Sequence, residues 1–190
     1  WVKTGDRILL ADKQAASVLE KARVESFARI SDAGDLSNTS LSHPLAGMEG
    51  SDGEWDEPRD FRAAPFVTEE DGTGFVHCAP SHGMDEFELY RDAGMLEQVL
   101  TYNVMEDGAM RADLPFFGGK RILKPNGKEG NVNAAVIEKL AESGKLLARG
   151  KIKHSYPHSW RSKAPLIYRN TPQWFAAIDR PVGDNQDEFG

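Results

Sequence analysis

The chain has 190 residues and a formal net charge of -7, and its 39% apolar and 28% charged residues exclude a disordered chain. Its longest unbroken apolar runs, residues 8–11 and 174–178, fall far short of the roughly 20 residues of a transmembrane helix, so we expect no membrane partner. The single cysteine, Cys78, excludes an internal disulfide and a four-cysteine zinc site, and we expect a protein of the reducing cytoplasm.

The first third of the chain predicts two short strands, one helix and a long loop. In chain order these elements are a strand over residues 7–11, a helix over 12–22 with Asp12 as its N-cap, and a strand over 25–30. Residues 31–64 are rich in Gly, Pro, Asp and Ser, which is typical of a loop, with a turn at Pro44–Gly47. Residues 49–71 carry nine acidic residues, so we expect an acidic loop there.

The middle of the chain predicts strands and turns around one helix. In order, these are strands over residues 65–68 and 73–79 around a turn at 70–72, a helix over 84–93 that ends at Gly94, and strands with turns over 98–124. The helix carries Phe87 and Tyr90 three positions apart, so both apolar rings belong to one face.

The last third predicts one further helix and more strands. They are a helix over residues 131–143 between Asn131 as cap and Gly144 as stop, and strands over 145–155 and 165–178. Because helices and strands do not alternate regularly, we expect an α+β fold with a mixed, barrel-like twisted sheet and peripheral helices. We expect residues 1–178 to form one domain of a longer protein and the acidic residues 179–190 to be a linker.

Residues 143–178 are unusual in an acidic protein, because they hold seven basic residues and no acidic one. Aromatic residues are interleaved with the basic ones. This pattern is typical of a surface that contacts a nucleic acid strand. It is also typical of a solvated face whose aromatic residues pack in the core, and composition alone leaves both interpretations open.

The densest polar cluster is GTGFVHCAPSHGMDEF, residues 72–87. The expected strand delivers His77, a loop turns the chain, and the expected helix begins with Asp85 and Glu86. Functional side chains often lie at such strand–loop–helix junctions. In the structural alternative, the two carboxylates stabilise the helix start and His77 is a core histidine.

Two other chemistries are conceivable for this cluster. Cys78 directly follows His77 on a predicted strand, so their side chains point to opposite faces, which argues against a nucleophilic pair. His77, His82 and Asp85 have side chains that ligate metals, but their spacing matches no common metal motif.

The second cluster is HSYPHSWRSKAPLIYRNTPQWF, residues 154–175. A proline between His154 and His158 disfavours a helix, so we do not expect these histidines to share a helical face. The aromatic residues suit core packing or stacking on a base, and Arg161 and Lys163 suit contacts with phosphate.

Together with Met105-Glu106-Asp107-Gly108, these clusters resemble the editing domain (connective peptide 1) that is inserted in isoleucyl-tRNA synthetases. The resemblance is clear over roughly residues 65–178, with the long motifs in the family's order. The valyl enzymes typically have lysine where His77 stands and lack the HSYP motif, and the leucyl enzymes differ after their GTG element. The resemblance therefore points to the isoleucyl member and implies the editing-domain fold that these three synthetases share.

The resemblance implies that the domain hydrolyses valine from mischarged tRNA(Ile) and that the tRNA acceptor end is its partner. It implies catalytic roles for His77, Asp85 and Glu86, substrate contacts for Thr73, Gly74 and Tyr156, and acceptor-end contacts for Lys151, Lys153, Arg161 and Lys163. The family's aspartate that binds the amino group falls on Glu86, with Asp85 just before it, so either residue fits that role. Ser159 stands where many members have cysteine.

The family's threonine-rich motif and the HIGH and KMSKS signatures are absent from the chain. We therefore expect an N-terminally incomplete editing domain that needs no metal or cofactor itself, in a parent ligase that uses ATP and magnesium. The alternatives are an acceptor-end binding or structural module without hydrolysis, and an unrelated metal hydrolase that uses His77 and His82.

Overall fold

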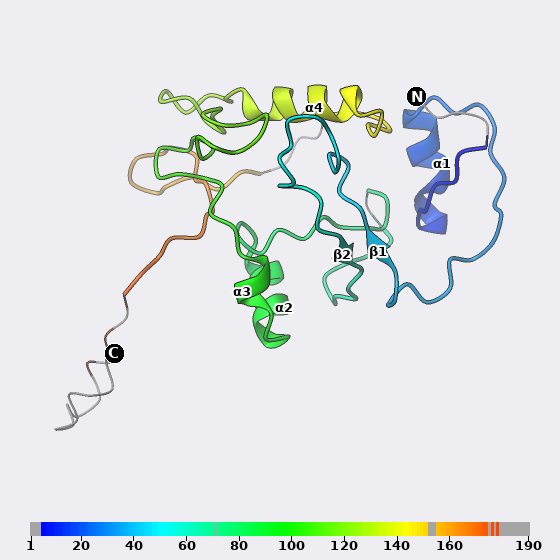
Figure 1. Ribbon diagram of the computed structural model, residues 1–190, viewed down its shortest axis with the longest axis horizontal. Coiled ribbons are helices and arrows are strands. Elements are labelled where there is room, and N and C mark those ends of the chain that lie inside the picture. The colour runs from blue at the N-terminus through cyan, green and yellow to red at the C-terminus, as the bar shows by residue number, and fades with distance from the viewer. Residues whose placement is uncertain (1–4, 71, 152–154, 175, 177, 179–190) are drawn as a thin grey trace.

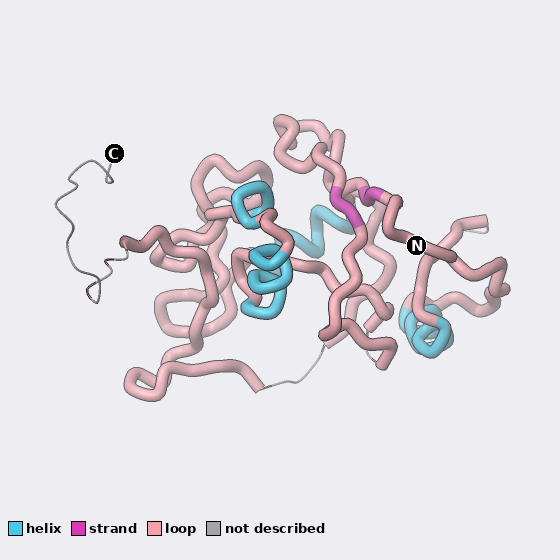
Figure 2. The backbone as a smooth tube through the Cα atoms, turned by 90° about the horizontal axis from the view of Figure 1, so that it is seen from below, coloured by secondary structure: helices cyan, strands magenta, loops and turns pink. Residues whose placement is uncertain are grey.

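The structure is a computed structural model that describes residues 5–70, 72–151, 155–174, 176 and 178. Within these residues there are four helices and one two-stranded antiparallel sheet. In chain order the elements are α1 (Asp12–Lys21), β1 (Ser40–Leu41), β2 (Arg59–Asp60), α2 (Met84–Asp92), α3 (Leu96–Val99) and α4 (Val132–Glu142), as labelled in Figure 1. Figure 2 shows that loops connect them over most of the chain's course. No helix in the described part of the chain is long and apolar enough to cross a bilayer.

The three predicted helices are confirmed as α1, α2 and α4, with bounds within one residue of those expected. The glycines predicted to end α2 and α4 have positive φ angles, +67° at Gly94 and +70° at Gly144, which a left-handed C-terminal stop requires. The sequence does not predict the short helix α3, because four residues are too few to show a helical period.

The predicted N-cap of α1 is wrong. Ala11 occupies the cap position, and Asp12 is the first helical residue. The Asp12 carboxylate instead accepts a 3.0 Å hydrogen bond from Nε of Arg29. At α4 the cap position of Asn131 is confirmed, but its side-chain oxygen accepts the backbone N–H of Arg121 at 2.8 Å rather than capping the helix.

The predicted strands do not form as regular strands in the described residues. Residues 98–124 hold isolated bridges, Val104–Met110 and Ala109–Arg121, and β1 and β2 lie in the segment predicted as loop. A strand needs a partner in register, and the apolar pattern of one segment does not specify that partner. The barrel-like sheet therefore stays a prediction.

The hydrophobic core lies between α4 and the loops around it. Leu45, Leu114 and Phe117 are each at most 5% exposed and form its centre. The partly buried residues packed against them are Met48, Trp55, Met110, Phe116, Ala135, Val136 and Leu140. The predicted loop of residues 31–64 thus supplies Leu45, from inside the turn at Pro44–Gly47, to the core.

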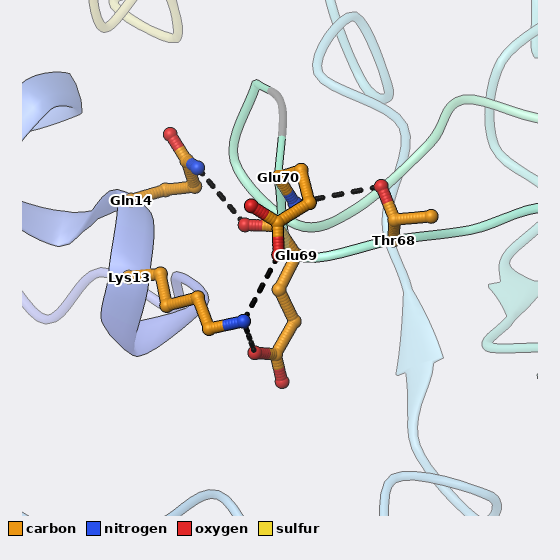
Figure 3. A network of polar contacts seen from close by, with 5 residues as sticks. All are labelled: Lys13, Gln14, Thr68, Glu69 and Glu70. Atoms are coloured by element: carbon orange, nitrogen blue, oxygen red, sulfur yellow. Dashed lines mark hydrogen bonds and ion pairs between the residues drawn. The ribbon is translucent and has the colours of Figure 1, made fainter.

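Helix α1 is attached to the last residues of the acidic loop by polar contacts (Figure 3). The ammonium group of Lys13 lies 3.5 Å from the Glu69 carboxylate and 3.0 Å from that of Glu70. The amide of Gln14 donates to the Glu69 carbonyl at 2.9 Å. All three charged side chains are more than half exposed, so these contacts are well solvated.

Candidate functional site

The two sequence motifs meet at one hydrogen bond. Nδ1 of His82, in the first motif, lies 2.8 Å from the carbonyl oxygen of Tyr168, in the second, although 86 positions separate them. Because a carbonyl oxygen only accepts, Nδ1 of His82 is the donor in this hydrogen bond. The structure thus brings residues 72–87 and 155–174 together.

The two candidate carboxylates of α2 have different surroundings. Glu86 folds back over Gly83, the N-cap residue, because a Cβ atom built on Gly83 would lie 1.7 Å from Oε2 of Glu86. Asp85 is exposed and makes no hydrogen bond or ion pair with any described residue. Both lie in the first turn of α2, where the helix dipole favours negative charge. A ligand therefore reaches Asp85 directly, whereas Glu86 must turn away from Gly83.

The Cys78 thiol is within electrostatic reach of Glu86. Burial raises the pKa of its thiol, and the negative charge of Glu86 adds to that effect. The thiol therefore stays protonated at neutral pH, which is the opposite of an activated nucleophile. His77 is exposed and Cys78 is half-buried, and the strand from which we predicted that they do not pair is not formed.

Thr73 and Gly74, predicted to contact substrate, also hold the start of α1. The Thr73 carbonyl accepts the backbone N–H of Ala11 at 2.9 Å. The Thr73 hydroxyl accepts the N–H of Phe75 at 3.3 Å. A Cβ on Gly74, whose φ is +80°, would lie 2.3 Å from Cβ of Ala11, so only glycine fits here. The GTG element therefore has a structural task that sequence reasoning did not assign to it.

A second histidine, His43, lies within electrostatic reach of His77 and is not marked by the sequence. Burial lowers the pKa of His43, and the charges of His77 and then Arg59 lower it further. Its ring stacks on Trp55 at 4.8 Å with an interplanar angle of 17°, and its Nδ1 accepts the N–H of Leu45 at 3.1 Å. No local pattern identifies His43, because Trp55 and His77, which set its surroundings, come later in the chain.

Tyr156 belongs to a hairpin formed by the second motif. Its hydroxyl donates to the Leu166 carbonyl at 2.8 Å, and its ring meets that of His158 edge-on at 6.0 Å. The hairpin is closed by the isolated bridge between His158 and Pro165. Since the hydroxyl serves the hairpin, the ring of this residue, which is 43% exposed as a whole, is the part that a substrate side chain would meet.

The predicted nucleic-acid contacts are only partly described. Arg161 and Lys163 are exposed at the turn of this hairpin, and Lys151 is exposed before it. Lys153 and His154 lie outside the described residues. None of the three described cations forms an ion pair with another described residue, so all three are available to an external anion.

The described residues offer no arrangement for a metal ion, since no three His, Cys, Asp or Glu side chains among them are grouped as ligands. His77, His82 and Asp85 are therefore not assembled into such a set. A wide groove of about 1890 Å³ lies elsewhere, between residues 5–33 and 141–149. None of the predicted site residues lines it.

No protein-family model matches the sequence. The isoleucine–tRNA ligase of Ruegeria pomeroyi is 66% identical over 192 residues, which cover 100% of this chain and 20% of that enzyme. The isoleucine–tRNA ligases of Rhodopseudomonas palustris and Bradyrhizobium diazoefficiens are 45% and 43% identical, each over 97% of this chain and 19% of the relative. The chain thus spans about a fifth of the length of the curated relatives it matches.

Proposed function

We propose that this chain, a segment that belongs to the isoleucine–tRNA ligase family, is the editing domain that hydrolyses valine from mischarged tRNA(Ile). The parent protein would be a cytoplasmic ligase that charges tRNA(Ile) with ATP and magnesium. The observation that carries the proposal is the His82–Tyr168 hydrogen bond at 2.8 Å, because it joins the two motifs on which the resemblance rests.

The chemistry explains why such a site is needed. An apolar pocket distinguishes side chains that differ by one methylene by only about 1–3 kcal/mol, so a second, size-limited site must remove the smaller amino acid. An aminoacyl ester is already activated, and positioned hydrogen bonds and a bound water suffice for its hydrolysis. No metal and no covalent nucleophile is required, which suits the protonated Cys78.

Each residue then has a task in this scheme. The carboxylate of Asp85 or Glu86 binds the ammonium group of the amino acid, and His77 orients the ester or the attacking water. The ring of Tyr156 limits the size of the accepted side chain. Thr73 and Gly74 bring their backbone close to the substrate, in addition to holding α1.

The test is deacylation of Val-tRNA(Ile), with Ile-tRNA(Ile) as control. We expect selective loss of valine, and no loss in the double variant Asp85→Ala/Glu86→Ala. Glu88→Ala is the matched control, because Glu88 is an exposed carboxylate on the same helix. Full activity in the double variant would contradict the assignment of the ammonium site, and the two single variants identify which carboxylate acts.

Tyr156 has its own test. Tyr156→Ala enlarges the pocket, so we expect the variant to hydrolyse Ile-tRNA(Ile) as well. Tyr156→Phe keeps the ring and removes only the hydroxyl that bonds to Leu166, so it should retain selectivity. If Ile-tRNA(Ile) resists the alanine variant, Tyr156 does not limit the size of the substrate.

A second candidate function is acceptor-end binding without hydrolysis. It is favoured by the exposed Arg161 and Lys163, which form no ion pair with a described residue, and by the absence of any described hydrogen-bond partner that would orient His77. Under this alternative the protein binds Val-tRNA(Ile) and leaves its ester intact, in all of the variants above.

A further inference from the structure

Two side chains hold the turn that carries Leu45 into the hydrophobic core. Nδ1 of His43 accepts the N–H of Leu45 at 3.1 Å, and Oδ1 of Asp56 accepts the N–H of Gly47 at 2.9 Å. A third hydrogen bond, from the Ala46 N–H to the His43 carbonyl, closes the turn at 3.0 Å. Leu45 is 3% exposed, so the position of a core residue depends on these polar contacts.

His43 differs from His82 and His158 in the direction of its hydrogen bond. Nδ1 of each of those two rings lies 2.8 Å from a carbonyl oxygen, which only accepts, so the ring donates. Nδ1 of His43 faces a backbone N–H, which only donates, so this ring accepts. A protonated imidazole carries hydrogen on both nitrogens. Protonation therefore preserves the hydrogen bonds of His82 and His158 and removes that of His43.

The surroundings of His43 set the pH at which this hydrogen bond is lost. Its ring is half-buried and stacks on Trp55 at 4.8 Å. Burial lowers the pKa of His43 below its ordinary value of 6.5, and the positive charges of His77 and Arg59 lower that pKa further. Asp56 is the acidic group at the same turn, and its carboxylate already accepts a backbone N–H. At neutral pH the ring is therefore neutral and the hydrogen bond is present.

We infer that His43 is a pH-sensitive switch in the core: when its ring takes up a proton, the Leu45 N–H loses its acceptor and the turn of residues 43–47 is released. The N–H of a buried residue is then left without a partner, which destabilises the native state. The stack on Trp55 does not oppose the release, because a cationic ring is attracted to the face of an indole. The ring stays on Trp55 while its hydrogen bond to the turn breaks.

The direction of the effect on stability follows from the lowered pKa of His43. The unfolded chain takes up the proton near pH 6.5, whereas the folded chain takes it up only at lower pH. Between these two values the unfolded state binds more protons, so stability falls as the pH drops through this interval. Above the interval the residue is neutral in both states, and its contribution is fully present.

The test is hydrogen exchange of the protein that contains this chain between about pH 8 and about pH 5, the range in which histidines titrate. Mass spectrometry of peptides that span residues 43–48 gives the exchange rate, which is divided by the intrinsic rate at each pH. We expect the protection of these amides to fall in acid by roughly 2- to 12-fold, the effect of losing one hydrogen bond.

His43→Asn is the decisive variant. An asparagine oxygen accepts the N–H two residues further along the chain and does not titrate, so protection in this variant should not change with pH. His158→Asn is the matched control, because His158 donates its hydrogen bond, and this variant should lose protection in acid as the parent does. Protection that is independent of pH in the parent, or that falls equally in His43→Asn, overturns the inference.

His77→Asn tests the same switch without changing His43, in case His43→Asn does not fold. It removes a positive charge that opposes protonation of His43, so the loss of protection should move to higher pH. A transition that does not move belongs to another group and overturns the inference. None of these measurements involves tRNA or deacylation, so their outcome is independent of the proposed function.

Discussion

Helices α4 and α1 differ in how they are held to the rest of the molecule. Helix α4 packs Ala135, Val136 and Leu140 against the buried cluster around Phe117. Helix α1 buries Val18 and Leu19. Its described contacts with residues 69–74 are polar: solvated ion pairs and hydrogen bonds at Glu69 and Glu70, and one backbone hydrogen bond from Ala11 to Thr73. The apolar attachment stabilises by removing surface from water, whereas solvated ion pairs contribute little.

The candidate site lies between these two regions. Gly74 touches Ala11, just before α1, and His77 follows three residues later. His43, which feels the charge of His77, stacks on Trp55 at the edge of the apolar cluster. The site is thus supported by the hydrophobic core on the His43 side and by the contacts with α1 on the Gly74 side.

The largest expected effect is in the core. Phe117→Ala removes a side chain that is 5% exposed and its edge-on contact with Trp55 at 6.2 Å, so we expect a decrease of about 3–5 kcal/mol in the free energy of unfolding. Phe27→Ala is the control, since Phe27 is 55% exposed, and it should change little. Urea denaturation of both variants measures the difference, and equal decreases would refute the described core.

The second largest loss of stability is expected where Gly74 lies against Ala11. Gly74→Ala and Gly72→Ala both place a side chain at positive φ, which costs roughly 1–2 kcal/mol. Only Gly74→Ala also collides with Ala11, which adds about 1–3 kcal/mol of overpacking. We expect the double variant Gly74→Ala/Ala11→Gly to recover that second part in urea denaturation. Equal destabilisation in the two single variants would show that Ala11 does not lie against Gly74.

A smaller effect distinguishes the two carboxylates of α2. Because Glu86 contributes to the raised pKa of Cys78, Glu86→Gln should lower that pKa and speed alkylation of the thiol at fixed pH. We expect no more than a few-fold change, since burial is the larger cause. Asp85→Asn should leave the rate unchanged. Cys78 is the single cysteine, so iodoacetamide labelling followed by mass spectrometry reads this site alone.

The smallest effect is expected at the ion pairs of α1. Lys13→Met removes the contacts with Glu69 and Glu70 and keeps a similar side-chain length. We expect a change in thermal stability that is barely measurable in dilute buffer and absent at high salt, because both partners are well solvated. A large destabilisation that persists at high salt would mean that the polar contacts, and not the approach at Gly74, hold α1.

The helices could be predicted from the sequence because each carries its own signals, such as the apolar period of residues 132–142 and the glycine that follows. The strands could not, because the runs at residues 73–79 and 145–155 show suitable composition without specifying any partner. The same limit applies to the site. The motif placed His77, Asp85 and Glu86 near one another along the chain, but His43 and the bond from His82 to Tyr168 depend on the fold.

The stack of His43 on Trp55 makes the indole an optical reporter. A protonated imidazole quenches indole emission, and because the pKa of His43 is lowered, emission from Trp55 should fall only below the usual titration range of histidine. The charge of His77 is one cause of that lowering. In a variant whose other three tryptophans are replaced by Phe, an anionic group bound beside His77 would offset this charge and move the emission change to higher pH.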